Sequence, residues 1–225
     1  MISLDLPTLP APFTDCAALF GPIDDGPTVP AVSLLETPDI VRAGVHAIAG
    51  KWGPGDLRAA ASLWSYGYFS RLLRPLLAYG VLADRWFSTG YDDVAAALSP
   101  MSTVARFGVR DSCEPEQAID SVIAHVEFVI ARCSAHTETT DRLHRSNAEF
   151  VFWRTLHLLS MSEEAAHHDR LTRINCHTAE FFPAFGKLVS RSAGTGPTRR
   201  VCCLRDRLSS LNRCANACPL QRRQA

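Results

Sequence analysis

Hydrophobic residues recur at helical spacing along most of the chain. In residues 57–73 the apolar positions follow one another three or four residues apart: Leu57, Ala60, Trp64, Tyr68 and Leu72. Residues 115–136 carry a second stripe of the same kind: Ile119, Val122, Ile123, Val126, Val129 and Ile130. Such spacing places apolar side chains on one face of an α-helix, where a core can bury them. Further helical segments are predicted for residues 142–161 and from residue 162 to about 191.

Proline, glycine and aspartate residues predict where these helices begin and end. A helix that starts after Pro38 is expected to stop at Gly50, because glycine often follows the last helical turn. Asp56 is expected to cap the next helix, because its carboxylate can accept a hydrogen bond from an N–H of the first turn. Pro75 is expected to kink or restart that helix, because proline has no N–H to donate.

Residues 91–110 have a different pattern. The stretches "DDVAAALS" and "STVARFGVR" are short and partly alternating, and Ser99-Pro100 lies between them. Alternation over a few residues on either side of a turn signal is typical of a β-hairpin. The predicted fold class is therefore mainly α, with one small antiparallel β-hairpin or sheet, at the margin of the α+β class.

Proline and glycine content divides the chain into three predicted parts. Residues 1–38 contain seven prolines and are expected to form an extended or loosely helical N-terminal arm laid on the core. Residues 39–191 form the helical body with its small β element. Residues 192–225 form a C-terminal segment, which begins with the predicted flexible joint "SAGTGP" (192–197).

Composition and charge narrow the classes of function. Of the 225 residues 47% are hydrophobic, 20% are charged, and the formal net charge is zero, so nothing global points to nucleic acid. The sequence has neither the features of a signal peptide nor an apolar stretch of about 18 residues that could form a transmembrane segment. A cytoplasmic protein is expected, with room only for peripheral membrane contact. In that reducing compartment clustered cysteines bind metal or perform redox chemistry more often than they form disulfides.

Four of the eight cysteines lie within seventeen positions near the C-terminus: Cys202, Cys203, Cys214 and Cys218. The segment around them is rich in arginine and has few apolar residues, so burial alone would not hold it in one conformation. A metal bound by the thiolates would hold it. Structural zinc fits the spacing of Cys214 and Cys218, although the adjacent Cys202 and Cys203 do not form a usual zinc knuckle. A [2Fe–2S] cluster, which needs two thiolates for each iron, accepts the irregular spacing. Spacing alone leaves zinc and iron–sulfur open.

The residues around the cysteines resemble the C-terminal end of the FhuF-like siderophore-iron reductase family. The likeness lies in "RRVCCLRDRL" followed by "C…CPL", and it extends upstream to residues 51–78 and 134–153. It implies a [2Fe–2S] cluster held by Cys202, Cys203, Cys214 and Cys218, which would be both the cofactor-binding residues and the metal ligands. The chain departs from the family pattern in having three residues, not two, between the last two cysteines.

The resemblance implies one-electron reduction of a ferric siderophore, with release of ferrous iron in the cytoplasm. The sequence leaves open whether the siderophore is a hydroxamate or a catecholate, with the hydroxamate type the more expected of the two, and the expected electron donor is a ferredoxin or a flavin reductase. No catalytic nucleophile or base is required. Arginines near the thiols would offset the negative charge of the cluster: Arg199, Arg200, Arg205, Arg207 and Arg213. Two alternatives remain: a zinc-stapled siderophore-binding or scaffold protein without redox activity, and a [2Fe–2S] electron carrier.

Residues outside the tail provide weaker candidates. The scattered cysteines are interpreted as inert core thiols: Cys16, Cys113, Cys133 and Cys176. Most members of an aromatic set are expected in the core, with one or two lining a cleft for the siderophore: Trp52, Trp64, Tyr66, Tyr68, Phe69 and Trp153. Several arginines could contact an anionic ligand, although a solvated helix face is the commoner role: Arg58, Arg71, Arg74 and Arg154.

Overall fold

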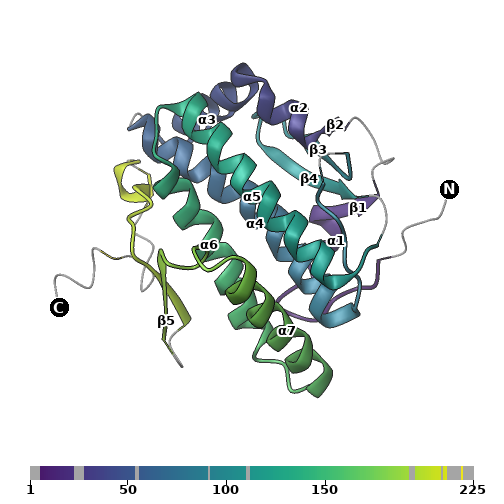
Figure 1. Cartoon of the computed structure of the whole chain (residues 1–225). Helices are drawn as coiled ribbons and strands as arrows, with labels where there is room; N and C mark the ends of the chain where they lie inside the picture. The colour runs from purple at the N-terminus through teal and green to yellow at the C-terminus, as the bar shows by residue number, and fades with distance from the viewer. Residues whose placement is uncertain are drawn as a thin grey trace.

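The protein is mostly helical and has one small mixed sheet, as the computed structural model in Figure 1 shows. The structure describes residues 6–22, 28–53, 56–90, 92–109, 112–192, 196–208, 210–211 and 219. The prediction of a mainly α fold with a small β element is confirmed. Among the described residues no helix is both long enough and apolar enough to cross a membrane.

Five long helices make up the body: α3 (Pro38–Trp52), α4 (Leu57–Ala83), α5 (Pro115–Thr137), α6 (Asp141–Leu159) and α7 (Ala165–Phe181). Helix α4 lies at the centre and packs against the other four (Figure 1). Its buried residues occur on every side of the helix, which is typical of a helix enclosed by its neighbours. The apolar stripe predicted for α5 is buried throughout, which confirms the orientation of that helix.

The predicted boundaries of α3 and α4 are partly confirmed. Asp56 caps α4, since its carboxylate accepts a hydrogen bond of 3.0 Å from the N–H of Arg58. The stop at Gly50 is wrong: α3 continues to Trp52, and Gly53 ends it with φ of +96°, a conformation that favours glycine. Helix α4 is a single element that includes Pro75. Pro75 costs one helical hydrogen bond, and the apolar residues on both sides of it, buried in the core, offset that loss.

The four-stranded sheet is larger than the predicted hairpin. Strands β3 (Val94–Leu98) and β4 (Val104–Val109) form the expected antiparallel pair. Strand β1 (Phe20–Pro22) adds to β4 in parallel, and β2 (Val29–Pro30) adds to β3 antiparallel, which gives the order β1-β4-β3-β2. The proline-rich arm therefore supplies both edge strands. Proline is tolerated in such edge strands because their outer side has no neighbouring strand that would need the N–H that proline lacks.

The N-terminal and C-terminal parts share the hydrophobic core of the body. Short helices α1 (Cys16–Leu19) and α2 (Ala31–Glu36) belong to the arm, and Leu9, Phe13 and Leu34 bury their side chains in the same cluster as α4. Leu208, from the cysteine-bearing segment, is fully buried in that cluster as well. The described residues thus form one packed unit with a single core.

The chain after α7 forms a β-hairpin rather than more helix. Strand β5 (Val189–Ser192) pairs antiparallel with β6 (Gly196–Arg199), and both strands contact α6. The hairpin lies on the side of the helices away from the four-stranded sheet (Figure 1). The predicted helix to about residue 191 therefore ends early, at Phe181. Of the predicted joint 192–197, three residues belong to β5 or β6 and residues 193–195 lie outside the described ranges.

Candidate functional site

The predicted cysteine ligands follow the hairpin directly. Cys202 and Cys203 lie between β6 and the short 3₁₀ turn η1 (Arg205–Arg207). The Cys203 side chain is 6% exposed, whereas Cys202 is partly exposed. Cys214 and Cys218 lie outside the described residues. The structure therefore locates one of the two predicted thiol pairs, at the point where the chain leaves the hairpin.

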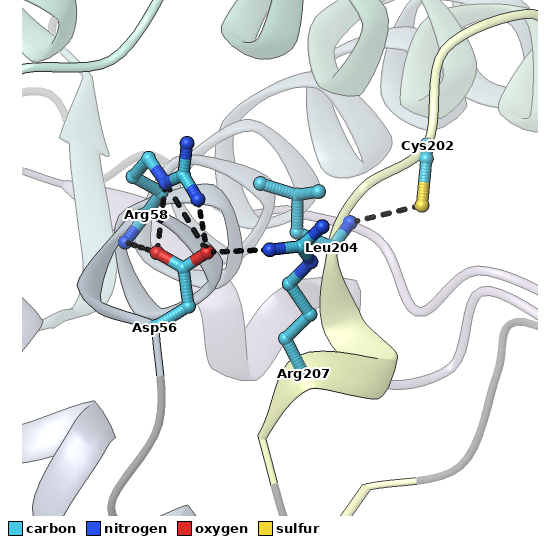
Figure 2. A network of polar contacts seen from close by, with 5 residues as sticks. All are labelled: Asp56, Arg58, Cys202, Leu204 and Arg207. Atoms are coloured by element: carbon cyan, nitrogen blue, oxygen red, sulfur yellow. Dashed lines mark hydrogen bonds and ion pairs between the residues drawn. The ribbon is translucent and has the colours of Figure 1, made fainter.

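A tight turn fixes the backbone next to these two thiols. Leu204 has φ of +59°, a left-handed conformation that is uncommon for a residue with a side chain and persists where its surroundings hold it. In this conformation its N–H donates to Cys202 Sγ at 3.4 Å (Figure 2). A donor aimed at sulfur stabilises the thiolate and raises the potential of a thiolate-bound redox centre. The Leu204 carbonyl in turn accepts from the N–H of Arg207 and closes the turn at 2.9 Å.

An ion pair joins this turn to the start of α4. Arg207 Nη1 lies 3.2 Å from Asp56 Oδ2, and Asp56 also binds Arg58 at 2.6 Å while capping the helix (Figure 2). The hydrogen bond from Arg58, together with these charges, lowers the pKa of Asp56 to about 2. Further along, the N–H of Ser210 donates to the Trp52 carbonyl at 3.1 Å. The segment that carries the thiols is therefore attached at the junction of α3 and α4.

Arg199 provides a second attachment, inside the body. Its side chain is 6% exposed, and its guanidinium lies 4.3 Å from the ring of Phe150 and 5.4 Å from that of Tyr66. It donates to Asn147 Oδ1, and the Asn147 amide donates to Ser65 Oγ at 3.0 Å. Sequence reasoning had grouped Arg199 with the arginines that offset cluster charge. The structure shows that its buried side chain connects β6 to α4 and α6.

Glu149 holds the entry to the hairpin and was not singled out from the sequence. Its side chain is fully buried, and Oε2 accepts a hydrogen bond of 2.7 Å from the N–H of Leu188. Burial raises the pKa of this carboxyl. An acidic residue within an apolar helical stretch was the only sequence signal for it.

A cavity of about 430 Å³ opens beside the thiol-bearing turn. It lies between α3, α4 and the β3–β4 turn, with Arg205 and Leu211 of the C-terminal segment in its wall. We call it the α3–α4 cavity. Six side chains give it its chemical character: Lys51, Trp52, Trp64, Tyr68, Arg71 and Arg205. Three of the predicted aromatic residues therefore do line a cleft, and they lie beside three cations.

The remaining arginines that were considered as ligand contacts lie elsewhere. Arg58 pairs with Asp56, Arg74 pairs with Asp15 at 2.7 Å, and the Arg154 guanidinium lies 5.9 Å from the Phe150 ring. Arg71 alone of this group reaches the α3–α4 cavity. The cavity could not be found from sequence patterns, because its walls come from segments as far apart as residues 48 and 211.

The scattered cysteines have the properties of inert thiols where the structure buries them. Burial raises the pKa of Cys16 and of Cys113 to about 11, and raises that of Cys133 further. These thiols remain protonated at neutral pH and are poor metal ligands. Cys176 is exposed on α7. Among the described residues no three His, Cys, Asp or Glu side chains converge, so the predicted ligand set depends on Cys214 and Cys218 for its completion.

The two described thiols, Cys202 and Cys203, have the ligand chemistry that an iron–sulfur cluster or a structural zinc would need. Adjacent thiols are present, one of them accepts a backbone N–H, and Arg205 and Arg207 follow within four residues. Thiolate ligands, hydrogen bonds to sulfur and nearby positive charge are what such a cluster requires. Comparison with known proteins adds no assignment: no protein-family model matches the chain, and no curated protein matches it.

Proposed function

We propose that this protein is a cytoplasmic siderophore-iron reductase that uses a [2Fe–2S] cluster. The observation that carries the proposal is the position of Arg205, which lines the α3–α4 cavity two residues after Cys203. One short stretch of the chain thus carries two of the predicted thiol ligands and, two residues later, forms part of the wall of a ligand-sized cavity. Electron transfer from a metal centre to a bound complex requires this kind of proximity.

Cys202, Cys203, Cys214 and Cys218 would hold the cluster. When bound, the cluster supplies one electron at a time to the ferric ion of the substrate. The Leu204 N–H and the guanidinium groups of Arg205 and Arg207 partly offset the charge of the thiolates and sulfides, which favours the reduced form. The same basic turn would attract an acidic electron donor such as a ferredoxin, and a flavin reductase is the other candidate.

The α3–α4 cavity would receive the ferric siderophore. Trp52 and Met101 provide apolar contact for the organic frame, whereas Trp64 and Tyr68 in the cavity wall are nearly buried. One electron passes from the donor through the protein to the iron, which changes from ferric to ferrous. The hard oxygen ligands of a siderophore hold ferrous iron far less well, so the metal exchanges away. No side chain needs to act as a nucleophile or general base.

Iron release tests this proposal. Anaerobically prepared protein is incubated with a chemical reductant, a ferric siderophore and a chelator that absorbs only when it binds ferrous iron. Wild-type protein is expected to accelerate ferrous iron release, and Cys202→Ser to abolish the acceleration. Cys176→Ser is the matched control, because Cys176 is an exposed thiol on α7. Equal rates with wild-type protein and Cys202→Ser would contradict the proposal.

A zinc-stapled binding or scaffold protein is the second candidate. The three residues between Cys214 and Cys218 fall within the spacing of zinc knuckles. Such a protein would be colourless and contain zinc without labile sulfide. An electron carrier, the third candidate, would contain the cluster and accept electrons, yet would leave every ferric siderophore unchanged.

A further inference from the structure

We propose that the α3–α4 cavity selects ferric complexes of net negative charge, such as tris-catecholates, through Lys51, Arg71 and Arg205. The inference rests on the proposed function for the identity of the metal. The charge preference itself follows from the cavity. The charge preference favours a catecholate substrate over the hydroxamate that was expected from the sequence.

The three cations of the cavity form no ion pair with an acidic side chain among the described residues, although Asp206 follows Arg205 in the chain. No Asp or Glu is among the described residues that line the cavity. Elsewhere on the surface arginines are paired with acids, as Arg145 is with Glu127 and Arg170 is with Asp84. The cavity is therefore a local concentration of positive charge in a chain whose net charge is zero.

Arg71 and Arg205 are also poorly solvated. Arg71 is partly buried, its pKa is lowered by that burial, and Nη1 donates to the Gly67 carbonyl at 3.1 Å. Arg205 Nε is buried and has no hydrogen-bond partner among the described residues. A buried donor without an acceptor is costly, so an oxygen-rich anion gains a stronger contact here than it would at a solvated lysine. Partial burial also strengthens the attraction between unlike charges.

The shape and the walls of the cavity fit an aromatic ligand. Its volume of about 430 Å³ lies within the usual range for small-molecule sites. Partly exposed Trp52 lines the cavity, and Lys51 Nζ lies 5.2 Å from its ring, whereas Trp64 is only 3% exposed. A tris-catecholate carries aromatic rings that can contact Trp52, and its ferric complex is a trianion. A tris-hydroxamate forms a neutral ferric complex, so these cations offer it no charge complementarity.

Binding of gallium(III) complexes tests the inference, because gallium(III) matches ferric iron in charge and is not reduced by the cluster. Isothermal titration calorimetry compares a hexadentate gallium(III) tris-catecholate with a hexadentate gallium(III) tris-hydroxamate. The tris-catecholate is expected to bind at least about tenfold more tightly at low salt. Its affinity should fall as salt screens the cavity, while that of the neutral complex changes little.

Charge-removing variants assign the preference to the cavity. Arg71→Gln, Arg205→Gln and Lys51→Gln should each weaken tris-catecholate binding, by about tenfold for the two arginines, and leave tris-hydroxamate binding unchanged. Arg142→Gln, an exposed position of α6 outside the cavity, is the matched control and should change neither affinity. Gly67→Ala keeps the charge and favours the helix, but its Cβ would lie 3.0 Å from Arg71 Nη1. Because this methyl group would displace the Arg71 guanidinium in a cavity that Gly67 itself lines, it should weaken the tris-catecholate more than the tris-hydroxamate in a fully folded protein.

The outcomes separate this inference from the proposed function. Equal affinities for the two complexes, or cavity variants that affect both complexes alike, would overturn the inference. Selective tris-catecholate binding by a protein without labile sulfide would support the inference and remove the reductase proposal. If the protein contains the cluster and mobilises iron but the cavity variants do not change binding, the reductase proposal is supported and the charge-selection inference is overturned.

Discussion

The helical body and the thiol-bearing segment (196–211) are stabilised by different physical means. The body buries almost every large apolar side chain, with α4 enclosed on all sides. The thiol-bearing segment buries only Leu208 fully in that core, packs Leu204 and Leu211 against it, and is otherwise held by the pairing of β6 with β5 and by polar contacts of Arg199, Arg207 and Ser210. The body is therefore stabilised mainly by burial of apolar side chains, whereas the thiol-bearing segment is stabilised by these attachments and, in our proposal, by the cluster.

Removal of a thiol should have the largest effect, and only on the thiol-bearing segment. Cys203→Ser is expected to abolish the visible absorption of the cluster, because the ligand supplies both a bond to iron and negative charge. The far-ultraviolet circular dichroism and the melting temperature of the body should change little. Loss of the cooperative melting transition in Cys203→Ser would show that the two regions are not stabilised separately.

Removal of the acceptor for Arg199 should weaken the body and its connection to the hairpin together. Asn147→Ala leaves a buried guanidinium without its amide oxygen, and we expect the free energy of unfolding to fall by about 3 kcal/mol. Chemical denaturation measures this change. Asn175→Ala is the matched control, because Asn175 is exposed on α7, and it should cost less than about 0.5 kcal/mol. Similar costs for the two variants would contradict the buried role of Arg199.

Acid should affect the body at a higher pH than the attachment of the thiol-bearing segment. Burial lowers the pKa of His125 and of His144 to about 4, from the ordinary value of 6.5. Because the folded state holds both rings neutral, the stability they contribute is fully present above pH 6.5 and is lost as the pH falls toward 4. We expect a loss of about 2 kcal/mol per histidine between pH 7 and pH 5.

The contrasting group is Asp56, whose pKa is lowered to about 2. Its contribution is fully present above the unfolded value of 3.8 and is lost only as the pH falls through 2. Denaturation at several pH values checks both statements, and His144→Gln should flatten the dependence between pH 7 and pH 5. A stability that is constant over that interval would show that the two histidines are not buried as described.

Loss of the exposed ion pair should have the smallest effect. Arg207→Gln removes the contact with Asp56, and since the Arg207 side chain is 55% exposed, we expect a change below about 1 kcal/mol. Hydrogen exchange should nevertheless increase at residues 204–208 and stay constant in α4. Arg173→Gln is the control, because it removes an exposed pair between Arg173 on α7 and Glu116 on α5. Increased exchange in the core of α4 would indicate that Arg207 supports the body as well.

The sequence predicted the elements whose signal is local. Helices α4 and α5 and the β3–β4 hairpin were predicted because apolar spacing and turn residues lie within one short window. The single apolar face predicted for α4 is wrong, because Leu57 is 47% exposed and the helix is buried on every side. Strands β1 and β2 were missed because each has two or three residues, and the parallel pairing of Phe20 with Phe107 has no local signature. The predicted restart of the helix at Pro75 is wrong, because tertiary burial on both sides of Pro75 outweighs the local cost of proline and α4 continues through it.

Some parts of the candidate site could likewise be predicted from the sequence, and others could not. The cysteine cluster is visible in the sequence because its residues are close together and chemically distinctive. The α3–α4 cavity is invisible there, since Lys51, Arg71 and Arg205 become neighbours only when α3, α4 and the tail pack together. Arg199 shows most clearly that a sequence pattern does not reveal whether an arginine is buried. An arginine in a basic run usually lies on a solvated surface, and only packing against Phe150 and Tyr66 reveals its buried position.

The central claim is that the C-terminal thiols hold a two-iron, two-sulfide centre capable of accepting one electron. Metal and acid-labile sulfide analysis of anaerobically purified protein, combined with electron paramagnetic resonance after dithionite reduction, tests it most directly. We predict equal amounts of iron and sulfide, about two of each per chain, and a paramagnetic signal that appears on reduction. Protein that contains zinc, lacks labile sulfide and remains silent after reduction would contradict the account.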